Sequence, residues 1–375
     1  MRALVLGSNA TLVLNAVSAL GAAGIEADVI SDWTAPRVRF SRYCRRYTRV
    51  PFESLHAGNN LAMLSEYCRE HAIDVVIPAD LACTFQLAEL NEDDLPRFPV
   101  ASPSTLEQLH DKWRFAQLLR SRQLPAPPTQ LLSPGSDGSE VELRFPVIVK
   151  PAAAEGGFGI VRCDTPADLA RERTRPEHRR GEWLVQEVIP GHDIDLSLLA
   201  DRGRVVAYTI QQDEASDKKR FLHDPEMLEI ACAIVHATQF HGLAHFDMRV
   251  EEGTGKLYVI ECNPRVWGSL MYSVWAGVNF IALGCRLARG ERLTISMPPS
   301  EHVWHQGVAP RRLFKALLQG RSSPEGMSGA TLASWRQAHG DPWIQLIGGL
   351  TERNEERWRK RLKSRVRDEE PVADA

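Results

Sequence analysis

Short apolar runs alternate with amphipathic segments over the first hundred residues, and this alternation constrains the fold more than any other feature. The runs Ala3–Leu6, Ala27–Ile30 and Asp74–Pro78 have strand length, and helical patterns follow them to Leu20, His71 and Leu90. A short strand is also expected at Val100. Strands that alternate with helices form parallel sheets, so we predict an N-terminal α/β domain.

The turn after the first predicted strand, Gly7-Ser8-Asn9, lacks the G-x-G-x-x-G spacing of a dinucleotide site. Asp80 follows a strand, where such sheets place ligand groups, but it could equally cap the next helix. Ser104 and Glu107 have the spacing of a capping box and predict a helical connector over Ser102–Leu119.

Composition and charge exclude several classes of protein. A chain of 375 residues exceeds one small core, so two or three domains are expected. The hydrophobic fraction of 43% and the net charge of −3 favour neither a membrane protein nor a nucleic-acid binder. The seven cysteines form no C-x-x-C pair, and Leu4–Leu20 is too interrupted for a signal peptide, so we expect a cytoplasmic protein with reduced thiols.

The segment F-P-V-I-V-K-P-A-A-A-E-G-G-F-G-I carries the first phosphate-binding signal. A buried strand presents Lys150, and the loop Gly156-Gly157-Phe158-Gly159 follows. Glycines let backbone amides lie against phosphate oxygens, and a lysine adds a point charge. A β-hairpin with glycines at its turn and a lysine reaching into solvent is the alternative.

The segment W-L-V-Q-E-V-I-P-G-H-D is the second candidate. The backbone of Gln186-Glu187-Val188-Ile189 could pair with an adenine edge, and Asp193 could accept hydrogen bonds from ribose hydroxyls. An ordinary strand, turn and strand would give the same pattern.

The third candidate is a hairpin around Ala244–Ile260 with a Gly253-Thr254-Gly255 turn. This turn places Asp247 alongside Glu261, and Asn263 follows on the returning strand. Two carboxylates repel unless a cation lies between them, and with an amide oxygen they suit Mg²⁺ bridging nucleotide phosphates. Arg265 could bind a phosphoryl oxygen. A hairpin with unpaired surface acids is the alternative.

In this order the signals resemble the ATP-grasp superfamily, and specifically its carbamoyl-phosphate-synthetase-like carboxylate–amine ligases. The resemblance covers about residues 1–290 and implies an N-terminal Rossmann-like parallel-sheet domain (1–103) before a two-subdomain ATP-grasp fold (104–292). A small lid subdomain would occupy about residues 125–190. Residues 293–375 lie outside this resemblance and are expected to form a helical region of unknown role.

The resemblance also implies roles for single residues. Lys112 and Lys150 would contact nucleotide phosphates, and Gly156, Gly157, Phe158 and Gly159 would cover them. Gln186, Glu187, Val188 and Ile189 would hold adenine, and Asp193 the ribose, with Asp195 as a competing candidate. Asp247, Glu261 and Asn263 would bind Mg²⁺, for which Mn²⁺ could substitute, while Arg265 and Lys150 would be catalytic. In this family the adenine-binding segment often begins with glutamate, whereas this sequence has Gln186 at that position.

The implied activity is ligation of a carboxylate to an amine, such as an amino acid, through an acyl phosphate, with release of ADP and phosphate. The expected partners are the two small-molecule substrates, and neither nucleic acid nor a membrane is expected. A homodimer is one alternative for the oligomeric state. Two rivals remain: a bicarbonate-using carboxylase or carbamoyl-phosphate-type enzyme, and a nucleotide-binding protein without turnover.

Overall fold

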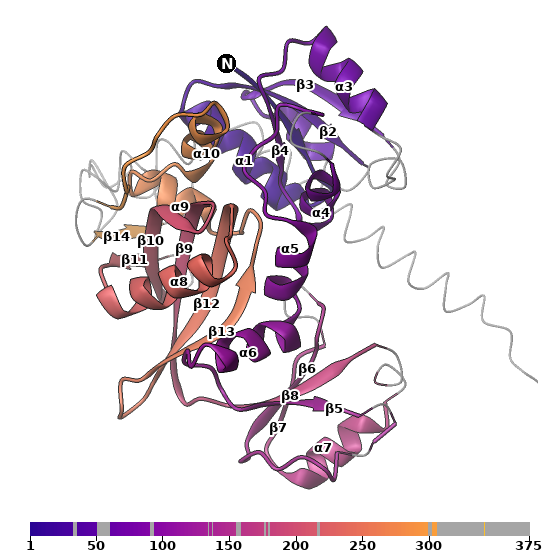
Figure 1. The fold of residues 1–375 in the computed structure, drawn as a ribbon, viewed down its shortest axis with the longest axis vertical. Helices are drawn as coiled ribbons and strands as arrows, with labels where there is room; N and C mark the ends of the chain where they lie inside the picture. Colours follow the sequence, from indigo (N-terminus) through magenta and orange to yellow (C-terminus); the bar gives the residue numbers. More distant parts are fainter. Residues whose placement is uncertain are drawn as a thin grey trace, which may run out of the picture.

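A computed structural model describes residues 1–32, 36–50, 61–90, 94–133, 135–136, 138–154, 159–175, 178, 181–215, 218–298, 302–305 and 341. Figure 1 shows three sheets arranged along the long axis of the molecule, with the N-terminal sheet at one end and the small sheet at the other. No helix in these ranges is long and apolar enough to cross a membrane.

The N-terminal sheet is parallel, as predicted, and has the strand order β3-β2-β1-β4. Its elements are β1 (Arg2–Leu6), α1 (Ala10–Ala22), β2 (Glu26–Ser31), the 3-10 helix η1 (Pro36–Phe40), β3 (Cys44–Arg49), α3 (Leu61–Glu70), β4 (Val75–Pro78) and α4 (Leu81–Glu89). Asp80 caps α4 by accepting from the Cys83 amide, and it also accepts from the Ser8 and Asn9 amides. The expected strand at Val100 is wrong, because pairing there is limited to one bridge between Val76 and Arg97.

The connector is two helices rather than the one predicted: α5 (Pro103–His110) and α6 (Lys112–Ser121). Asp111 is extended, ends α5 and caps α6, so the chain changes direction there. The predicted cap at Ser104 is also wrong. Ser102 accepts from the Thr105 amide instead, because Pro103 at the first helical position favours a start two residues earlier.

The small sheet has the order β5-β8-β6-β7 and is antiparallel. It consists of β5 (Thr129–Leu132), β6 (Val147–Pro151), β7 (Val161–Cys163) and β8 (Trp183–Glu187), with α7 (Pro166–Arg173). Its core is a separate apolar cluster that includes Val147, Val149 and Val185.

The large sheet has the order β13-β12-β9-β10-β11-β14. Its strands are β9 (Gly191–Asp201), β10 (Arg204–Ala215), β11 (Lys218–Leu222), β12 (Gly242–Glu251), β13 (Leu257–Asn263) and β14 (His302–His305), and α8 (Pro225–Ala237), α9 (Leu270–Trp275) and α10 (Phe280–Ala288) pack around it. The predicted C-terminal helical region, residues 293–375, is wrong at His302–His305, which pair with β11 as β14 of the large sheet. Beyond β14, only Asp341 of this region is described.

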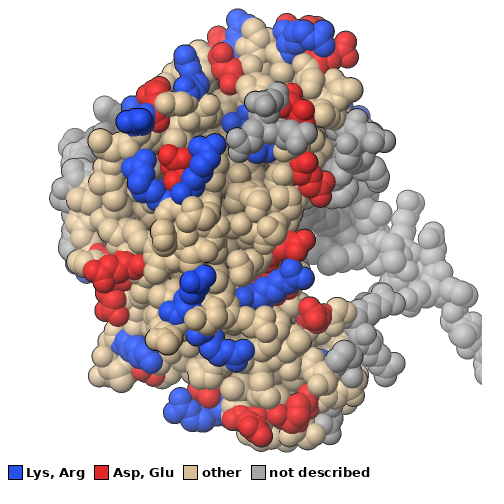
Figure 2. Space-filling view, viewed as in Figure 1, with Lys and Arg blue, Asp and Glu red and all other residues tan. Residues whose placement is uncertain are grey.

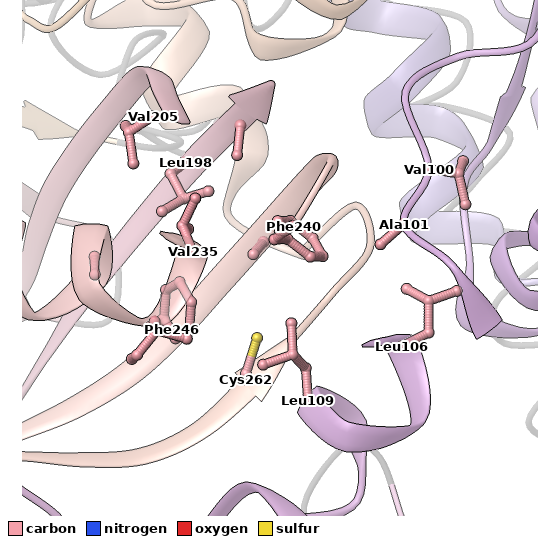
Figure 3. Packing of buried hydrophobic residues seen from close by; sticks show 14 of the residues in the cluster. Val100, Ala101, Leu106, Leu109, Leu198, Val205, Val235, Phe240, Phe246 and Cys262 are labelled. Carbon is pink, nitrogen blue, oxygen red and sulfur yellow. The ribbon is translucent and has the colours of Figure 1, made fainter. Parts of the chain in front are cut away.

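One apolar core joins the connector to the large sheet. Figure 3 shows Leu109 of α5 next to Cys262 of β13 and near Phe240, while Leu106 of the same helix points toward Val100 and Ala101. This packing holds α5 against the large sheet and therefore fixes the start of α6, where Lys112 lies, beside β13. On the face seen in Figure 2, acidic and basic side chains are interspersed over the described surface.

Candidate functional site

A cavity of about 530 Å³ lies between the small and the large sheet. This volume is typical of a small-molecule site. Its walls combine the predicted residues of three separate segments: Lys150, Gln186, Glu187, Val188 and Ile189 from the small-sheet side, and Asp193, Asp195, Asp247 and Glu261 from the large sheet. Ile148, Ile160, Arg162, Asp213, Met248, Arg249 and Ile260 complete the lining.

Two lysines from different elements lie close to the acidic residues of the cavity, where Arg162 and Arg249 add further positive charge to the lining. Lys150 on β6 is almost fully buried and donates to the Gln186 side-chain oxygen at 2.9 Å. Lys112 donates to the Ala154 carbonyl at 2.6 Å, and its Nζ lies 3.5 Å from Glu261 Oε2. Burial, reinforced by the charge of Lys112, lowers the pKa of Lys150 to about 8 against the opposing pull of Glu261. Both amines therefore face the same acidic wall.

The hairpin of β12 and β13 confirms the predicted pairing of Asp247 with Glu261, which are directly opposite each other. A bulge follows this pair, so that Met248 lies opposite Val259 and Ile260 is the extra residue. The bulge lets Val259 and Cys262 both face the core although they are three residues apart, while Ile260 and Glu261 both face the cavity. Simple alternation along the strand does not predict this.

The two paired carboxylates differ in their electrostatics. Burial raises the pKa of Asp247 to about 6, and the charge of Glu261 adds to this rise against the hydrogen bond from His245. Burial also opposes ionisation of Glu261, but the charges of Lys112 and Lys150 and the hydrogen bonds from its neighbours lower its pKa overall. The two carboxylates therefore have different cationic partners: Glu261 has the lysines, and Asp247 has His245.

This set of donors fits a hard divalent cation, because two carboxylates on adjacent strands offer oxygens toward one cavity. Asn263 directs its Nδ2 toward Asp247 Oδ2 at 3.4 Å, and its Oδ1 accepts from Arg265 at 3.1 Å. The amide oxygen could join the two carboxylates only after the amide turns, which would also free that arm of Arg265. The assignment of all three residues as metal ligands stays a prediction.

The segment predicted to hold adenine is partly occupied by protein contacts. Glu187 forms an ion pair with Arg144 at 3.0 Å, and its amide donates to the Pro128 carbonyl. The Val188 amide donates to the Pro146 carbonyl. A base that contacts Glu187 or Val188 would therefore use their carbonyl oxygens. Gln186 holds Lys150 with its side chain, which is a role that the sequence pattern did not predict.

Asp193 and Asp195 both line the cavity but lie in different surroundings. Asp193 forms an ion pair with Arg249, which also donates to the carbonyls of Ile189 and Gly191. Asp195 lies opposite Asp247 on the neighbouring strand. Asp193 is thus at the predicted adenine end and Asp195 at the predicted metal end, an arrangement that favours Asp193 for the ribose.

Gly156, Gly157 and Phe158 of the predicted phosphate lid lie outside the described residues. Gly159 is described and has a φ of +74°, a left-handed conformation that favours glycine. Their role over the phosphates stays a prediction.

Sequence reasoning missed His245, which forms an ion pair with Asp247 at 3.1 Å, and Gln211, whose amide contacts Asp195. His245 could have been found, because it precedes Asp247 by two residues and so shares its face of the strand. Gln211 gave no such signal, since its place depends on the pairing of β10 with β9.

Residues 179–307 match the family described as ATP-grasp in the biosynthetic pathway with Ter operon. The carbamoyl phosphate synthase arginine-specific large chain of Bacillus subtilis is 25% identical over 222 residues, which are 55% of this chain and 21% of that protein. The D-alanine–D-alanine ligase of Xylella fastidiosa is 25% identical over 173 residues, which are 41% of this chain and 57% of the ligase. The matches thus span less than two thirds of either relative.

Among solved structures, a biotin carboxylase from Campylobacter jejuni in a beta-gamma-ATP complex superposes with a TM-score of 0.62 and 17% identity. The superposition covers 78% of this chain and 71% of that chain. At this identity the likeness shows the fold alone.

Proposed function

Since the chain belongs to the ATP-grasp superfamily, we propose that it is an ATP- and Mg²⁺-dependent ligase that joins a carboxylate to an amine. The observation that carries the proposal is the meeting of Lys112 and Lys150 with Asp247 and Glu261 at one cavity between two sheets. Such a set of opposite charges suits the phosphates of a nucleotide together with a divalent cation.

In the proposed reaction a carboxylate oxygen attacks the γ-phosphorus of ATP, giving an acyl phosphate and ADP. The amine nitrogen then attacks the acyl carbon, phosphate leaves, and the amine loses a proton. The protein needs no nucleophile of its own, because phosphoryl transfer depends on positioning and charge.

Each cluster of the site has a part in this scheme. Lys112 and Lys150 would neutralise nucleotide phosphates, and Arg265 would stabilise the phosphoryl group during its transfer. Asp247, Glu261 and Asn263 would hold Mg²⁺, which supplies charge compensation between the phosphates when it is bound. Gln186 would keep Lys150 in place through the hydrogen bond that it accepts.

The test is coupled detection of ADP over paired panels of carboxylates and amines, with hydroxylamine added to trap an acyl phosphate. ADP release that needs Mg²⁺, a carboxylate and an amine, with a hydroxamate when hydroxylamine replaces the amine, is the expected result. ADP release that needs only bicarbonate would indicate a carboxylase instead. Nucleotide binding without ADP under any pair would indicate a protein that binds and does not turn over.

A further inference from the structure

Polar side chains cross the large sheet in two adjacent rows and extend two strands beyond the predicted Mg²⁺ ligands. The register places Glu261, Asp247, Asp195 and Gln211 opposite one another, one on each of β13, β12, β9 and β10. The second row, two residues along each strand, consists of Asn263, His245, Ser197 and Thr209. Residues two apart share a face of the sheet, so the two rows form one polar surface.

Three possible metal ligands meet at the centre of this surface. His245 Nε2 lies 3.1 Å from Asp247 Oδ1 and 3.9 Å from Asp195 Oδ2. One ligand atom from each of Asp195, His245 and Asp247 lies within 4.8 Å of the others. Among the described residues, Asp195 contacts neither Lys112, which forms an ion pair with Glu261, nor Lys150, which donates to Gln186. The cluster therefore differs from the Lys112–Glu261 contact.

The neighbours of His245 orient its ring toward the two carboxylates. Its Nδ1 lies 2.8 Å from the hydroxyl of the fully buried Ser197, and its ring stacks on Trp267 with centroids 5.5 Å apart. When Nδ1 donates to Ser197, the lone pair of Nε2 points at two carboxylate oxygens. Metal-binding histidines are commonly held in this way by a hydrogen bond from the other ring nitrogen.

Gln211 provides an independent sign that a ligand is missing from this surface. Its side chain is fully buried, and its Nε2 donates to Ser269 at 2.7 Å and lies 3.4 Å from Asp195 Oδ2. Its Oε1 has no hydrogen-bond partner among the described residues. A buried amide oxygen without a partner is costly, and the amide that carries it contacts Asp195 through Nε2, so an open acceptor lies on the same residue that borders the cluster. Lys219 is the lysine whose charge acts on both Asp195 and His245, and it forms its ion pair with Asp213.

We propose that Asp195, His245 and Asp247 bind a divalent transition metal, such as Mn²⁺ or Zn²⁺, at a site separate from the nucleotide-dependent Mg²⁺ site. A nitrogen ligand beside two carboxylates favours such metals over Mg²⁺. With bonds of about 2.1 Å, neighbouring ligand atoms lie about 3.0 to 3.5 Å apart. The observed 3.1 Å between His245 Nε2 and Asp247 Oδ1 lies within this range, whereas the 3.9 Å to Asp195 Oδ2 would shorten on metal binding.

A bound ammonium group fits this cluster less well than a metal ion. Hydrogen bonds of about 2.8 Å in tetrahedral directions need acceptors about 4.6 Å apart. His245 Nε2 and Asp247 Oδ1, at 3.1 Å, are too close to accept from two different N–H groups of one ammonium.

Asp247 would connect the two metal sites. Its Oδ1 faces His245, whereas its Oδ2 faces Asn263 of the predicted Mg²⁺ site. The transition metal would therefore lie between β12 and β9, on the side of Asp247 away from Glu261 and its partner Lys112.

The experiment is pulsed EPR of Mn²⁺ bound to the full-length protein without nucleotide. Coordinated imidazole gives a characteristic ¹⁴N modulation, which we expect in the wild type and expect to be absent in His245→Gln. Asp195→Asn should weaken Mn²⁺ binding at least about tenfold in an EPR titration, because it removes a charged ligand at almost constant shape. Glu261→Gln is the matched control and should keep the ¹⁴N modulation.

Two outcomes would overturn the proposal. If the wild type shows no ¹⁴N modulation, a proton on Nε2 and not a metal joins His245 to the carboxylates. If the modulation survives in His245→Gln, the nitrogen belongs to another histidine. Circular dichroism would show whether His245→Gln folds. If it does not fold, the Asp195→Asn variant decides: an unchanged Mn²⁺ affinity in that variant would overturn the proposal. These readouts involve neither ATP nor turnover, so they do not depend on the proposed ligase activity.

Discussion

Glu261 illustrates how single charges are set at the residue scale. It lies opposite Asp247 on the neighbouring strand and within 3.5 Å of Lys112 Nζ, and the lysine charges lower its pKa although burial opposes this. The carboxylate therefore stays ionised inside the cavity. A charged oxygen held in this way is suited to binding a divalent cation. Glu261 would contribute to catalysis by binding Mg²⁺, and only if the reaction requires Mg²⁺.

Glu261→Gln should leave the fold and nucleotide binding largely intact and reduce ADP formation at least about a hundredfold. The reason is that glutamine keeps the shape but removes the charge that would hold the cation between the phosphates. Steady-state ADP release and nucleotide titration measure the two effects. Glu252→Gln, an exposed acid at the hairpin turn, is the control and should retain wild-type rates. Near-normal ADP formation in Glu261→Gln would contradict the metal assignment.

Lys150 should make nucleotide binding depend on pH. Its pKa of about 8 means that the free protein loses this charge as the pH rises through 8, whereas bound phosphates would raise the pKa and keep the lysine protonated. We therefore expect ATP affinity to fall above pH 8 and proton uptake to accompany binding there. Calorimetry in two buffers with different ionisation enthalpies measures the uptake. Lys150→Gln should abolish it, and binding by the wild type without proton uptake would contradict the prediction.

The effect of Lys150 on the stability of the fold has the opposite pH dependence: stability rises with pH, whereas ATP affinity falls. Its pKa in the folded protein is about 8 and lies below the ordinary 10.5. The unfolded chain thus binds more protons between these two values, and the cost of burying the charge is relieved as the pH rises through this window.

At the scale of elements, the junction of the two sheets depends on how β9 begins. Gly191 is the first residue of β9, pairs with Glu251 at the end of β12, and has a φ of +139°. A Cβ there would lie 1.9 Å from the Val250 carbonyl oxygen. The chain can therefore leave the small sheet and enter the large one at this point only with a residue that lacks a side chain.

Gly191→Ala should lower the free energy of unfolding by more than about 2 kcal/mol, because backbone must shift to admit the methyl group. Urea unfolding followed by circular dichroism measures this loss. Gly253→Ala is the control: it also has a positive φ, of +82°, but has no atom within 4 Å of an added Cβ. It should cost about 1 kcal/mol. Equal losses in the two variants would mean that the close approach at Gly191 does not matter.

At the scale of the whole molecule, the N-terminal sheet and the large sheet share one apolar core. Phe98 follows the N-terminal sheet and packs in a cluster with Val5 of β1, Leu199 of β9 and Phe280 of α10. Gly284 of α10 leaves room for it, because a Cβ at that glycine would lie 2.0 Å from the Phe98 ring. These contacts hold the N-terminal sheet against the elements that carry the site.

Phe98→Ala should lower the free energy of unfolding by about 3 to 5 kcal/mol by leaving a cavity in this shared core. Fluorescence and circular dichroism should report one common transition at lower urea concentration. Phe98→Leu, which fills most of the space, should lose clearly less. Two separate transitions in the wild type would instead show that the N-terminal sheet unfolds on its own.

The local pattern was sufficient where a residue's place follows from its neighbours in the chain. The alternation of strands and helices predicted the parallel sheet, and the Gly253-Thr254-Gly255 turn predicted that Asp247 faces Glu261. It failed at Ser104 and Val100, where Pro103 and a single bridge decide the boundaries. It also gave no sign of the bulge at Ile260, because a bulge depends on the register with β12.

By itself, then, the sequence determined the order of the elements, the hairpin and the kinds of side chain that could bind a nucleotide. Only the tertiary structure decided which of these side chains meet. Lys112 comes beside Glu261 because α5 packs on the large sheet, and Asp195, His245 and Gln211 converge because β9 lies between β12 and β10. Such contacts join residues far apart in the chain, and their geometry is set by strand order and packing, which no local pattern encodes.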